Sequence, residues 1–213
     1  MRYFLESCCA SLEAVRRAVL SGADRIELCE DLACGGVTPS AALIRQALSV
    51  AGSVPVNVLV RPRAGDFVYG PEEVRTMLDT IRLCKRLGVN GVVIGALTQE
   101  GRVDTSTMQT LLAQARPLAI TFHRAFDECR DPSAALEEII GLGIERLLTS
   151  GHCVNAYEGR FALKRLVDQA AGRIVIMPGC GITPSNLEEI ASVTGAVEFH
   201  GSNITPEAAC IPE

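Results

Sequence analysis

A glycine-led phrase that recurs along the chain constrains its fold more than any other feature of the sequence. Residues 22–29 read GADRIELC, and similar segments follow at residues 88–95, 143–151 and 195–201. In each segment a glycine that would end a helix precedes a short run rich in β-forming residues. The run closes on a small or polar residue. A chain that repeats this pattern is expected to alternate helices with buried parallel strands.

Eight strands are predicted in all. The predicted strands are residues 3–8, 25–29, 56–61, 92–95, 118–123, 146–150, 174–178 and 197–200. Helical patterns lie between them, and Val74, Met77, Leu78, Ile81 and Cys84 have the spacing of one apolar helix stripe. Eight alternating β and α units predict a single (β/α)8 barrel domain, or TIM barrel, over residues 1–213. A doubly wound open sheet is the alternative, but the even spacing and the eighth strand favour closure.

The end of the chain departs from a complete barrel. Residues 38–40, 131–133 and 183–185 each place proline between a capping residue and a serine, which predicts a helix start. After Asn203 only ten residues remain, which is too few for a full eighth helix. The last helix is therefore expected to be short or missing, with residues 204–213 as a tail. Either the barrel is open on that side or a second subunit covers the exposed patch, so we expect a homo-oligomer.

Composition excludes several classes of function. The net charge of -5 argues against binding to nucleic acid or to a membrane surface. No apolar run reaches the length of a membrane span, and the first residues lack the apolar core of a signal peptide. A cytoplasmic location is therefore predicted. The nine cysteines are an odd number without the spacing of a disulfide framework, so they are expected to be thiols.

A Glu-x-Cys pattern occurs on two neighbouring predicted strands. Residues two apart on a strand share a face, so Glu6 lies beside Cys8 and Glu27 beside Cys29. Ile26 must meet the helices, which turns Glu27 and Cys29 into the barrel. Neighbouring strands are about 4.8 Å apart, so two thiols and two carboxylates are expected to meet near the mouth. Soft thiolates select Cu(I) or Zn²⁺, although ordinary core thiols are the alternative because no tight Cys-x2-Cys spacing occurs.

Cationic residues follow several of the predicted strands. Arg61 and Arg63 end the third strand, His123 and Arg124 follow the fifth, and His200 ends the eighth. Arginine binds carboxylate or phosphate through its planar guanidinium group. The carboxyl end of the strands is where barrel enzymes carry their chemistry. These residues therefore predict an anion site at the barrel mouth.

Glycine-containing loops follow the last two strands. Gly179 and Gly181 lie in the first of them, Gly201 and Ser202 in the second. In barrels, loops at this position often hold a phosphate group. Asp127 either orients Arg124 or serves as a general base.

Internal pairing of the charges is the alternative to an anion site. Glu6, Glu27 and Glu198 point inward by alternation, and the mouth arginines could simply neutralise them. Paired charges inside a barrel still cost desolvation free energy. A lining this polar therefore favours a functional site over a purely structural role. His152 and Cys153 are expected in a solvated loop rather than as ligands.

Six motifs occur in an order and spacing that resemble one family. They are LESC, GADRIELC, GGVTPS, RPRAGDFVY, TFHRAFD and LLTSG. Together they resemble the CutC family of copper-homeostasis proteins from Glu6 to His200. The resemblance implies a (β/α)8 barrel, a cytoplasmic location and the handling of Cu(I), with Cys8 and Cys29 at the positions of the proposed ligands. The final segment and last helix typical of the family are missing here.

Two functional hypotheses follow, and they belong to different classes. In the first, the protein binds Cu(I) through Cys8 and Cys29, with Glu6 and Glu27 modulating the site. In the second, it is an enzyme that acts on a small phosphorylated or carboxylated metabolite. The anion would then be held by Arg61, Arg63 and Arg124, and the acid or base would be His123, Glu27 or Asp127. A third possibility is an oligomeric binding scaffold that uses the surface left bare by the tail.

Overall fold

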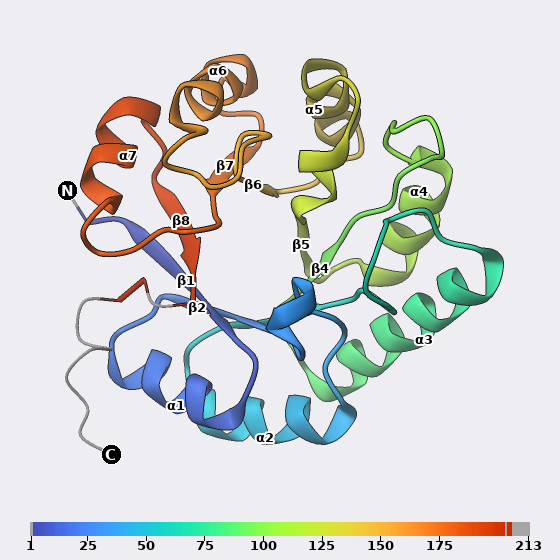
Figure 1. The fold of residues 1–213 in the computed structure, drawn as a ribbon. Coiled ribbons are helices and arrows are strands. Elements are labelled where there is room, and N and C mark those ends of the chain that lie inside the picture. Colours follow the sequence, from blue (N-terminus) through green and yellow to red (C-terminus); the bar gives the residue numbers. More distant parts are fainter. Residues whose placement is uncertain (1, 203, 206–213) are drawn as a thin grey trace.

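The computed structural model describes residues 2–202, 204 and 205. Its eight strands form one parallel sheet in the order β7-β6-β5-β4-β3-β2-β1-β8 (Figure 1). The strands are β1 (Phe4–Cys9), β2 (Arg25–Leu28), β3 (Val56–Leu59), β4 (Gly91–Ile94), β5 (Ala119–Phe122), β6 (Arg146–Thr149), β7 (Val175–Pro178) and β8 (Glu198–Gly201).

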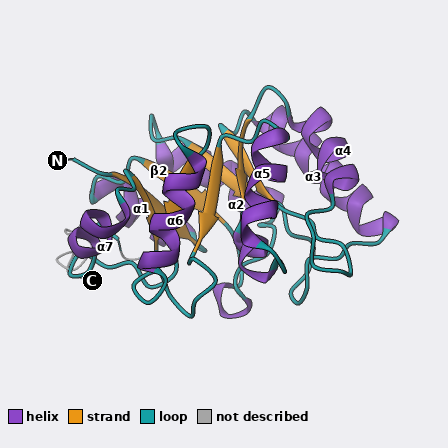
Figure 2. Ribbon diagram, turned by 90° about the horizontal axis from the view of Figure 1, so that it is seen from above, coloured by secondary structure: helices purple, strands orange, loops and turns teal. Residues whose placement is uncertain are grey.

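Helices surround the strands, as the view from above shows (Figure 2). They are α1 (Leu12–Leu20), α2 (Ala41–Ala51), α3 (Pro71–Leu87), α4 (Thr105–Ala115), α5 (Pro132–Gly141), α6 (Arg160–Ala170) and α7 (Leu187–Thr194). Two 3-10 helices, η1 (Leu32–Cys34) and η2 (Arg124–Glu128), lie in the loops after β2 and β5. None of the helices in the described part of the chain is both long and apolar enough to cross a membrane.

The predicted barrel is confirmed, with its seam between the seventh and eighth strands. Each strand from β1 to β7 pairs with the next, and β8 pairs in parallel with β1, where Glu6 lies opposite His200. No ladder joins β7 to β8 within the described residues. No helix follows β8 in that part of the chain either, so the ring of helices is interrupted between α7 and α1 (Figure 1). Residues 206–213 of the predicted tail lie outside the described residues.

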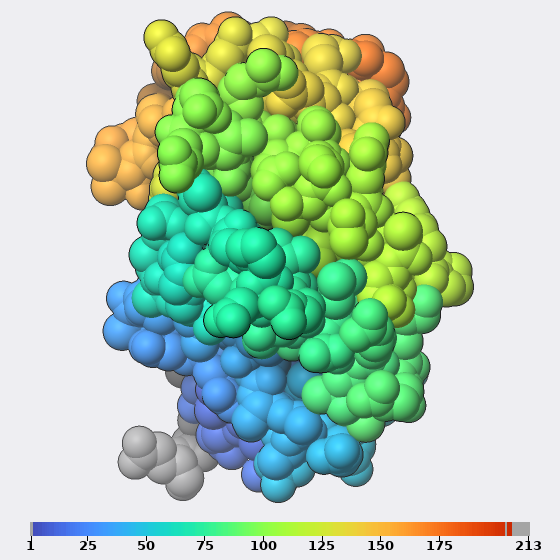
Figure 3. Space-filling view, turned by 90° about the vertical axis from the view of Figure 1, so that its right-hand side faces the viewer, coloured from blue at the N-terminus to red at the C-terminus, as the bar shows by residue number. Residues whose placement is uncertain are grey.

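The four glycines that led the recurring phrase do end helices. Gly22, Gly88, Gly143 and Gly195 have φ angles of 77°, 78°, 70° and 72°. These values lie in the left-handed region that only glycine enters without strain, so the helix can stop and the chain can turn into the next strand. Consecutive units consequently lie side by side around the barrel, and the colours of Figure 3 follow the sequence from one end of the molecule to the other.

Several predicted boundaries were wrong by one to three residues. β3 ends at Leu59, two residues before the predicted end, and β2, β4, β5 and β6 each end one residue early. The polar residues after these strands therefore lie in loops. Asp131 caps α5 by accepting from the backbone N–H groups of Ser133 and Ala134, as predicted. α2 begins at Ala41 with Ser40 as its cap, and α7 begins at Leu187, because the earlier Thr-Pro pairs lie in the approach to each helix.

Strand alternation separates two buried regions. Ile26 and Leu28 point outward into the large core between strands and helices. A smaller cluster inside the barrel is formed by Cys8, Cys29, Leu59 and Val93. The predicted inward orientation of the two cysteines is therefore confirmed.

Candidate functional site

A network of buried charges forms one layer inside the barrel. Glu6 is fully buried and accepts hydrogen bonds from Arg25 and from His200 Nδ1, the latter at 2.9 Å. Glu198 accepts from Nη2 of Arg25 at 2.8 Å and from Nε of Arg146 at 2.6 Å. Burial alone would raise the pKa of Glu6, but the hydrogen bond from His200 and the charge of Arg25 outweigh it and lower the pKa to about 2.

This network corrects the internal-pairing alternative. The residues that neutralise the inward carboxylates of Glu6 and Glu198 are Arg25 and Arg146, not the arginines at the mouth. Arg25 and Arg146 open their strands, so their side chains reach inward at the opposite end from the mouth. The alternation that placed Glu6 inward also predicts this orientation for both arginines.

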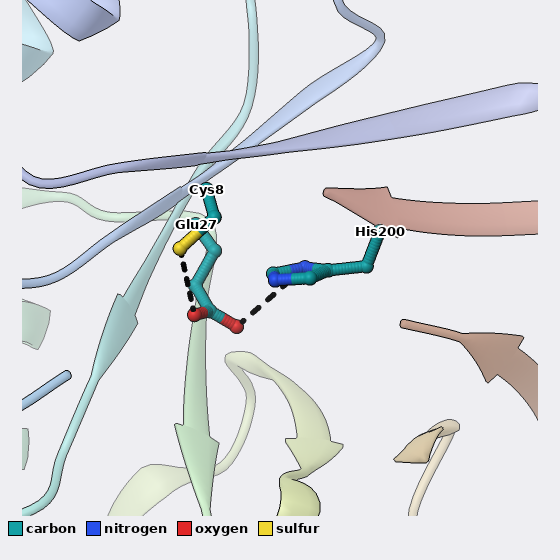
Figure 4. Close-up of side chains that lie close together, drawn as sticks. All are labelled: Cys8, Glu27 and His200. Carbon is teal, nitrogen blue, oxygen red and sulfur yellow. Dashed lines mark hydrogen bonds and ion pairs between the residues drawn. The ribbon is translucent and has the colours of Figure 1, made fainter. Parts of the chain in front are cut away.

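Cys8, Cys29, Glu27 and His200 form a cluster at the C-terminal ends of β1, β2 and β8. The Sγ atoms of Cys8 and Cys29 are 3.8 Å apart, and the Cys8 thiol donates to Glu27 Oε1 at 3.7 Å. His200 Nδ1 lies 3.9 Å from Glu27 Oε2. One donor atom from each of Cys8, Glu27 and His200 lies within 4.8 Å of the other two (Figure 4). The pairing of β8 with β1 brings His200 to a cluster that the sequence assigned to two strands only.

The chemistry of this donor set fits a soft or borderline metal ion. It combines thiol sulfur, imidazole nitrogen and a carboxylate, and Glu27 Oε2 is buried without a hydrogen-bond partner. The hydrogen bond with Cys29, burial and the charge of Glu27 raise the pKa of Cys8 well above its usual value. Burial raises the pKa of Glu27 as well. A bound cation would reverse both effects, because it stabilises thiolate and carboxylate.

A cavity of about 600 Å³ opens above this cluster at the barrel mouth. Among the predicted site residues, its lining includes Cys8, Glu27, Arg61, His123, Arg124, Asp127, Gly181, Gly201 and Ser202. Three predicted residues are not part of the lining: Cys29, Arg63 and Gly179. Cys29 lies behind Cys8, since it is fully buried in the inner cluster.

The three mouth arginines have different partners. Arg61 donates to the backbone carbonyl oxygens of Cys34, Gly36 and Gly65 at 3.1, 2.9 and 2.7 Å. Arg63 is bound to the carboxylates of Asp66 and Glu73 and lies outside the cavity. Arg124 pairs with Asp127 at 2.8 Å and keeps a partly exposed side chain at the cavity.

Asp127 joins the loops after β5 and β6. Besides the Arg124 guanidinium, its carboxylate accepts from the Thr149 hydroxyl at 2.5 Å and from the backbone N–H groups of Ser150 and His152. These donors fix the position of the carboxylate, and the carboxylate in turn orients Arg124. Of the two roles predicted for Asp127, the geometry therefore favours orientation over general-base chemistry.

His123 is a neutral residue enclosed in the cavity wall. Its Nδ1 accepts from the backbone N–H of Ala125 at 3.1 Å, which places the ring proton on Nε2. Burial and the neighbouring charge of Arg61 lower the pKa of His123 to about 3. The Nε2 atom is buried and has no hydrogen-bond partner in the described structure. The side chain is therefore suited to donate a hydrogen bond rather than to accept a proton.

Other cavity residues lie in loops and were not among the predicted site residues. Cys34, Cys153 and Cys180 line the cavity and are half-buried, and His152 lines it as well. His152 and Cys153 lie in a loop, as expected, and are half-buried against the cavity, where the backbone N–H of His152 donates to Asp127. Their position directly after β6 was the available signal.

Comparison with known proteins identifies relatives over nearly the whole chain. A model of the CutC family matches residues 3–205. A CutC family protein from Parabacteroides distasonis is 46% identical over 202 residues, which cover 95% of this chain and 83% of the relative. The human copper homeostasis protein cutC homolog is 49% identical over 200 residues, covering 94% of this chain and 73% of the relative.

Solved structures agree with the fold. The crystal structure of a CutC protein from Streptococcus agalactiae matches with a TM-score of 0.91 at 34% identity, over 95% of this chain and 100% of that one. A deoxyribose phosphate aldolase from Aeropyrum pernix matches with a TM-score of 0.72 at 13% identity, over 97% of this chain and 90% of that one. The latter likeness concerns the barrel fold alone.

Proposed function

The chain belongs to the CutC family, and on that premise we propose that it is a cytoplasmic copper-homeostasis protein that binds Cu(I) through Cys8 and Cys29. The copper is cargo, held at the base of the cavity. The name of the human relative, copper homeostasis protein cutC homolog, supports the role, and the donor atoms of this chain support the site.

The distance between the two thiols carries the proposal. Their Sγ atoms are 3.8 Å apart on adjacent strands. A bond of about 2.3 Å, as for zinc and thiolate, places two sulfurs on one metal ion at most about 4.6 Å apart. The pair can therefore hold one ion without a change in the strands. Thiolate sulfur is also the donor that Cu(I) prefers over oxygen.

His200 and Glu27 complete the surroundings of the thiols. Glu6 accepts a hydrogen bond from the Nδ1–H of His200, which leaves Nε2 of the ring as the atom for a metal ion. A carboxylate that orients a metal-binding histidine is a common arrangement in metal sites. Glu27 would balance charge beside Cys8. Because the Cys8 thiol is protonated without metal, binding of copper would release its proton.

The state of the cysteines supports the same role. Cys8, Cys9, Cys29, Cys34, Cys84, Cys129, Cys153 and Cys180 are all free thiols in the described structure. Free thiols are the usual state of cysteine in the cytoplasm. We extend the proposal to a homo-oligomer, because no helix of the described residues covers the barrel between α7 and α1.

A Cu(I) titration of the fully reduced protein against a competing chelator tests the proposal. We expect the double variant Cys8→Ser, Cys29→Ser to lose more than about 100-fold in affinity, because loss of direct ligands exceeds the 10- to 100-fold effect of outer partners. The matched control is Cys34→Ser, Cys153→Ser, which removes two thiols from the cavity rim and should retain the tight site. Equal affinity in the wild-type protein and the Cys8/Cys29 variant would refute the copper site.

A further inference from the structure

Polar atoms without partners gather around the cavity at the barrel mouth. Seven buried side-chain atoms of the described residues lack a hydrogen-bond partner, and four of them belong to residues that line this cavity. Glu27 Oε2 belongs to the metal cluster, and the other three are the nitrogen atoms Arg61 Nε, His123 Nε2 and His152 Nε2. Buried polar atoms in folded proteins are normally hydrogen-bonded, and an unsatisfied one costs about 1–3 kcal/mol. Their concentration here indicates a wall that is incomplete without a bound molecule.

Arg61 is a buried cation whose counter-charge is missing among the described residues. Its side chain is only 6% exposed, and its neighbours are uncharged: it donates to three backbone carbonyl oxygens and lies beside the hydroxyl of Tyr69. No carboxylate within the described ranges lies within 4.0 Å of its guanidinium group, although the Phe67 ring faces it at 4.7 Å. Buried charges are normally paired, because an isolated ion in a protein interior is costly. An anion in the cavity would supply the missing partner.

His123 lies near Arg61 and has an N–H group that can donate a hydrogen bond. The hydrogen bond from Ala125 to Nδ1 leaves the proton on Nε2, and that N–H has no acceptor. Phe67 links the two groups, since its ring centroid is 4.9 Å from that of His123. Two unsatisfied N–H groups, one of them on a cation, thus flank one aromatic ring in the cavity wall.

We propose that this wall binds a small organic anion, one of whose carboxylate or phosphate oxygens accepts hydrogen bonds from Arg61 Nε and His123 Nε2. Both atoms are buried in the cavity wall, so binding of the oxygen requires a shift of the side chains packed against them, Phe67 among them. The site is separate from the copper cluster, because Arg61 and His123 follow β3 and β5, whereas Cys8, Glu27 and His200 lie on β1, β2 and β8.

Further features of the cavity fit a ligand of this class. Its volume of about 600 Å³ falls within the range of about 300–1,000 Å³ that is usual for small-molecule sites. Arg124 lies at the same cavity with a 42% exposed side chain, so it can meet a second anionic group. The neutral state of His123 adds no charge that would depend on pH in the physiological range.

The test uses the reduced wild-type protein labelled with ¹⁵N. The chain has three histidines, so their ring N–H signals are readily assigned in NMR spectra. Glycolate serves as the carboxylate probe, 2-phosphoglycolate as the phosphate probe and ethylene glycol as the uncharged control. We expect an anionic probe to shift the His123 Nε2–H signal in a saturable way and ethylene glycol to leave it unchanged. A response to 2-phosphoglycolate alone assigns the site to phosphate, and a response to both anions assigns it to carboxylate.

Variants then locate the binding. Arg61→Met should lower the affinity for the probe that binds by at least about tenfold, as expected for loss of a charge-assisted hydrogen bond. The matched control Arg102→Met removes an exposed arginine that is paired with Glu138, and should bind as the wild type does. If Arg61→Met does not fold, the His123 signal of the wild-type protein decides alone.

The outcome is independent of copper. The variant Cys8→Ser, Cys29→Ser should keep its affinity for the anion even where it has lost Cu(I). Absence of any His123 response to both anions, or equal affinity in the Arg61→Met and Arg102→Met variants, would overturn the anion site and leave the copper proposal untouched.

Discussion

Replacing His123 by asparagine should remove a large part of the acid sensitivity of the fold. His123 is 5% exposed, and burial and the charge of Arg61 lower its pKa to about 3. Its value in the unfolded chain is about 6.5. Between these values the unfolded state binds a proton that the folded state does not, so stability is complete above about pH 6.5 and is lost as the pH falls toward about 3. Asparagine does not titrate, and its side-chain oxygen can still accept from Ala125 N–H.

The size of the effect follows from the two pKa values. At about pH 5 the protonation of His123 in the unfolded chain removes about 2 kcal/mol of folding free energy that is present at about pH 7.5. For a chain of this length that corresponds to a fall in melting temperature of about 4–8 °C. The variant should lose packing, and therefore stability, at both pH values. The difference in unfolding free energy between the two proteins should nevertheless shrink by about 2 kcal/mol at the lower pH.

Urea unfolding followed by far-ultraviolet circular dichroism measures this directly, because the chain has no tryptophan to report by fluorescence. The other two histidines remain in both proteins, so their titration cancels in the comparison. If the stability of His123→Asn falls between about pH 7.5 and pH 5 as steeply as that of the wild type, the histidine titrates near its ordinary pKa and the buried neutral donor is refuted.

Two further substitutions test the interior. Glu6→Gln should destabilise the fold by about 2–3 kcal/mol, because His200 loses its buried carboxylate and Arg25 keeps only Glu198. Glu13→Gln, in an exposed pair with Arg16, should cost less than about 1 kcal/mol, and equal melting temperatures for the two variants would contradict the network. Gly95→Ala would place a Cβ 2.7 Å from the His123 ring, so we expect a loss of about 1–3 kcal/mol in urea unfolding and weaker binding of the anionic probe, with Cu(I) affinity retained. Unchanged anion affinity in that variant would show that the position of His123 does not matter to the site.

The fold and part of the cluster were predictable because they depend on local periodicity. The helix-ending glycines and apolar runs located all eight strands, with errors of one or two residues at their ends. Alternation along β1 and β2 placed Cys8 and Cys29 inside the barrel, and the structure brings their sulfur atoms together. The same rule could have identified Arg25 and Arg146 as the partners of Glu6 and Glu198, had it been applied to the first residue of each strand.

The mouth could not be predicted in the same way. Arg61, Arg63 and Arg124 look equivalent in the sequence, yet one binds backbone carbonyl oxygens, one is held outside the cavity by Glu73 and one pairs with Asp127. Which acceptor an arginine meets depends on the path of the neighbouring loops, and loop backbone has no repeating pattern from which that path can be read. The placement of His152 over the cavity has the same origin.

The amino-acid sequence by itself thus determined the barrel, its polar interior and the inward direction of the two thiols. Side chains alternate between the two faces of a strand, so the direction of each one can be read from the residues next to it in the sequence. Only the tertiary structure decided that His200 contacts Glu6 across 194 residues and that Arg61 is buried without a carboxylate partner among the described residues. These contacts arise from closure of the sheet and from loop conformation, which bring together groups that no local pattern relates.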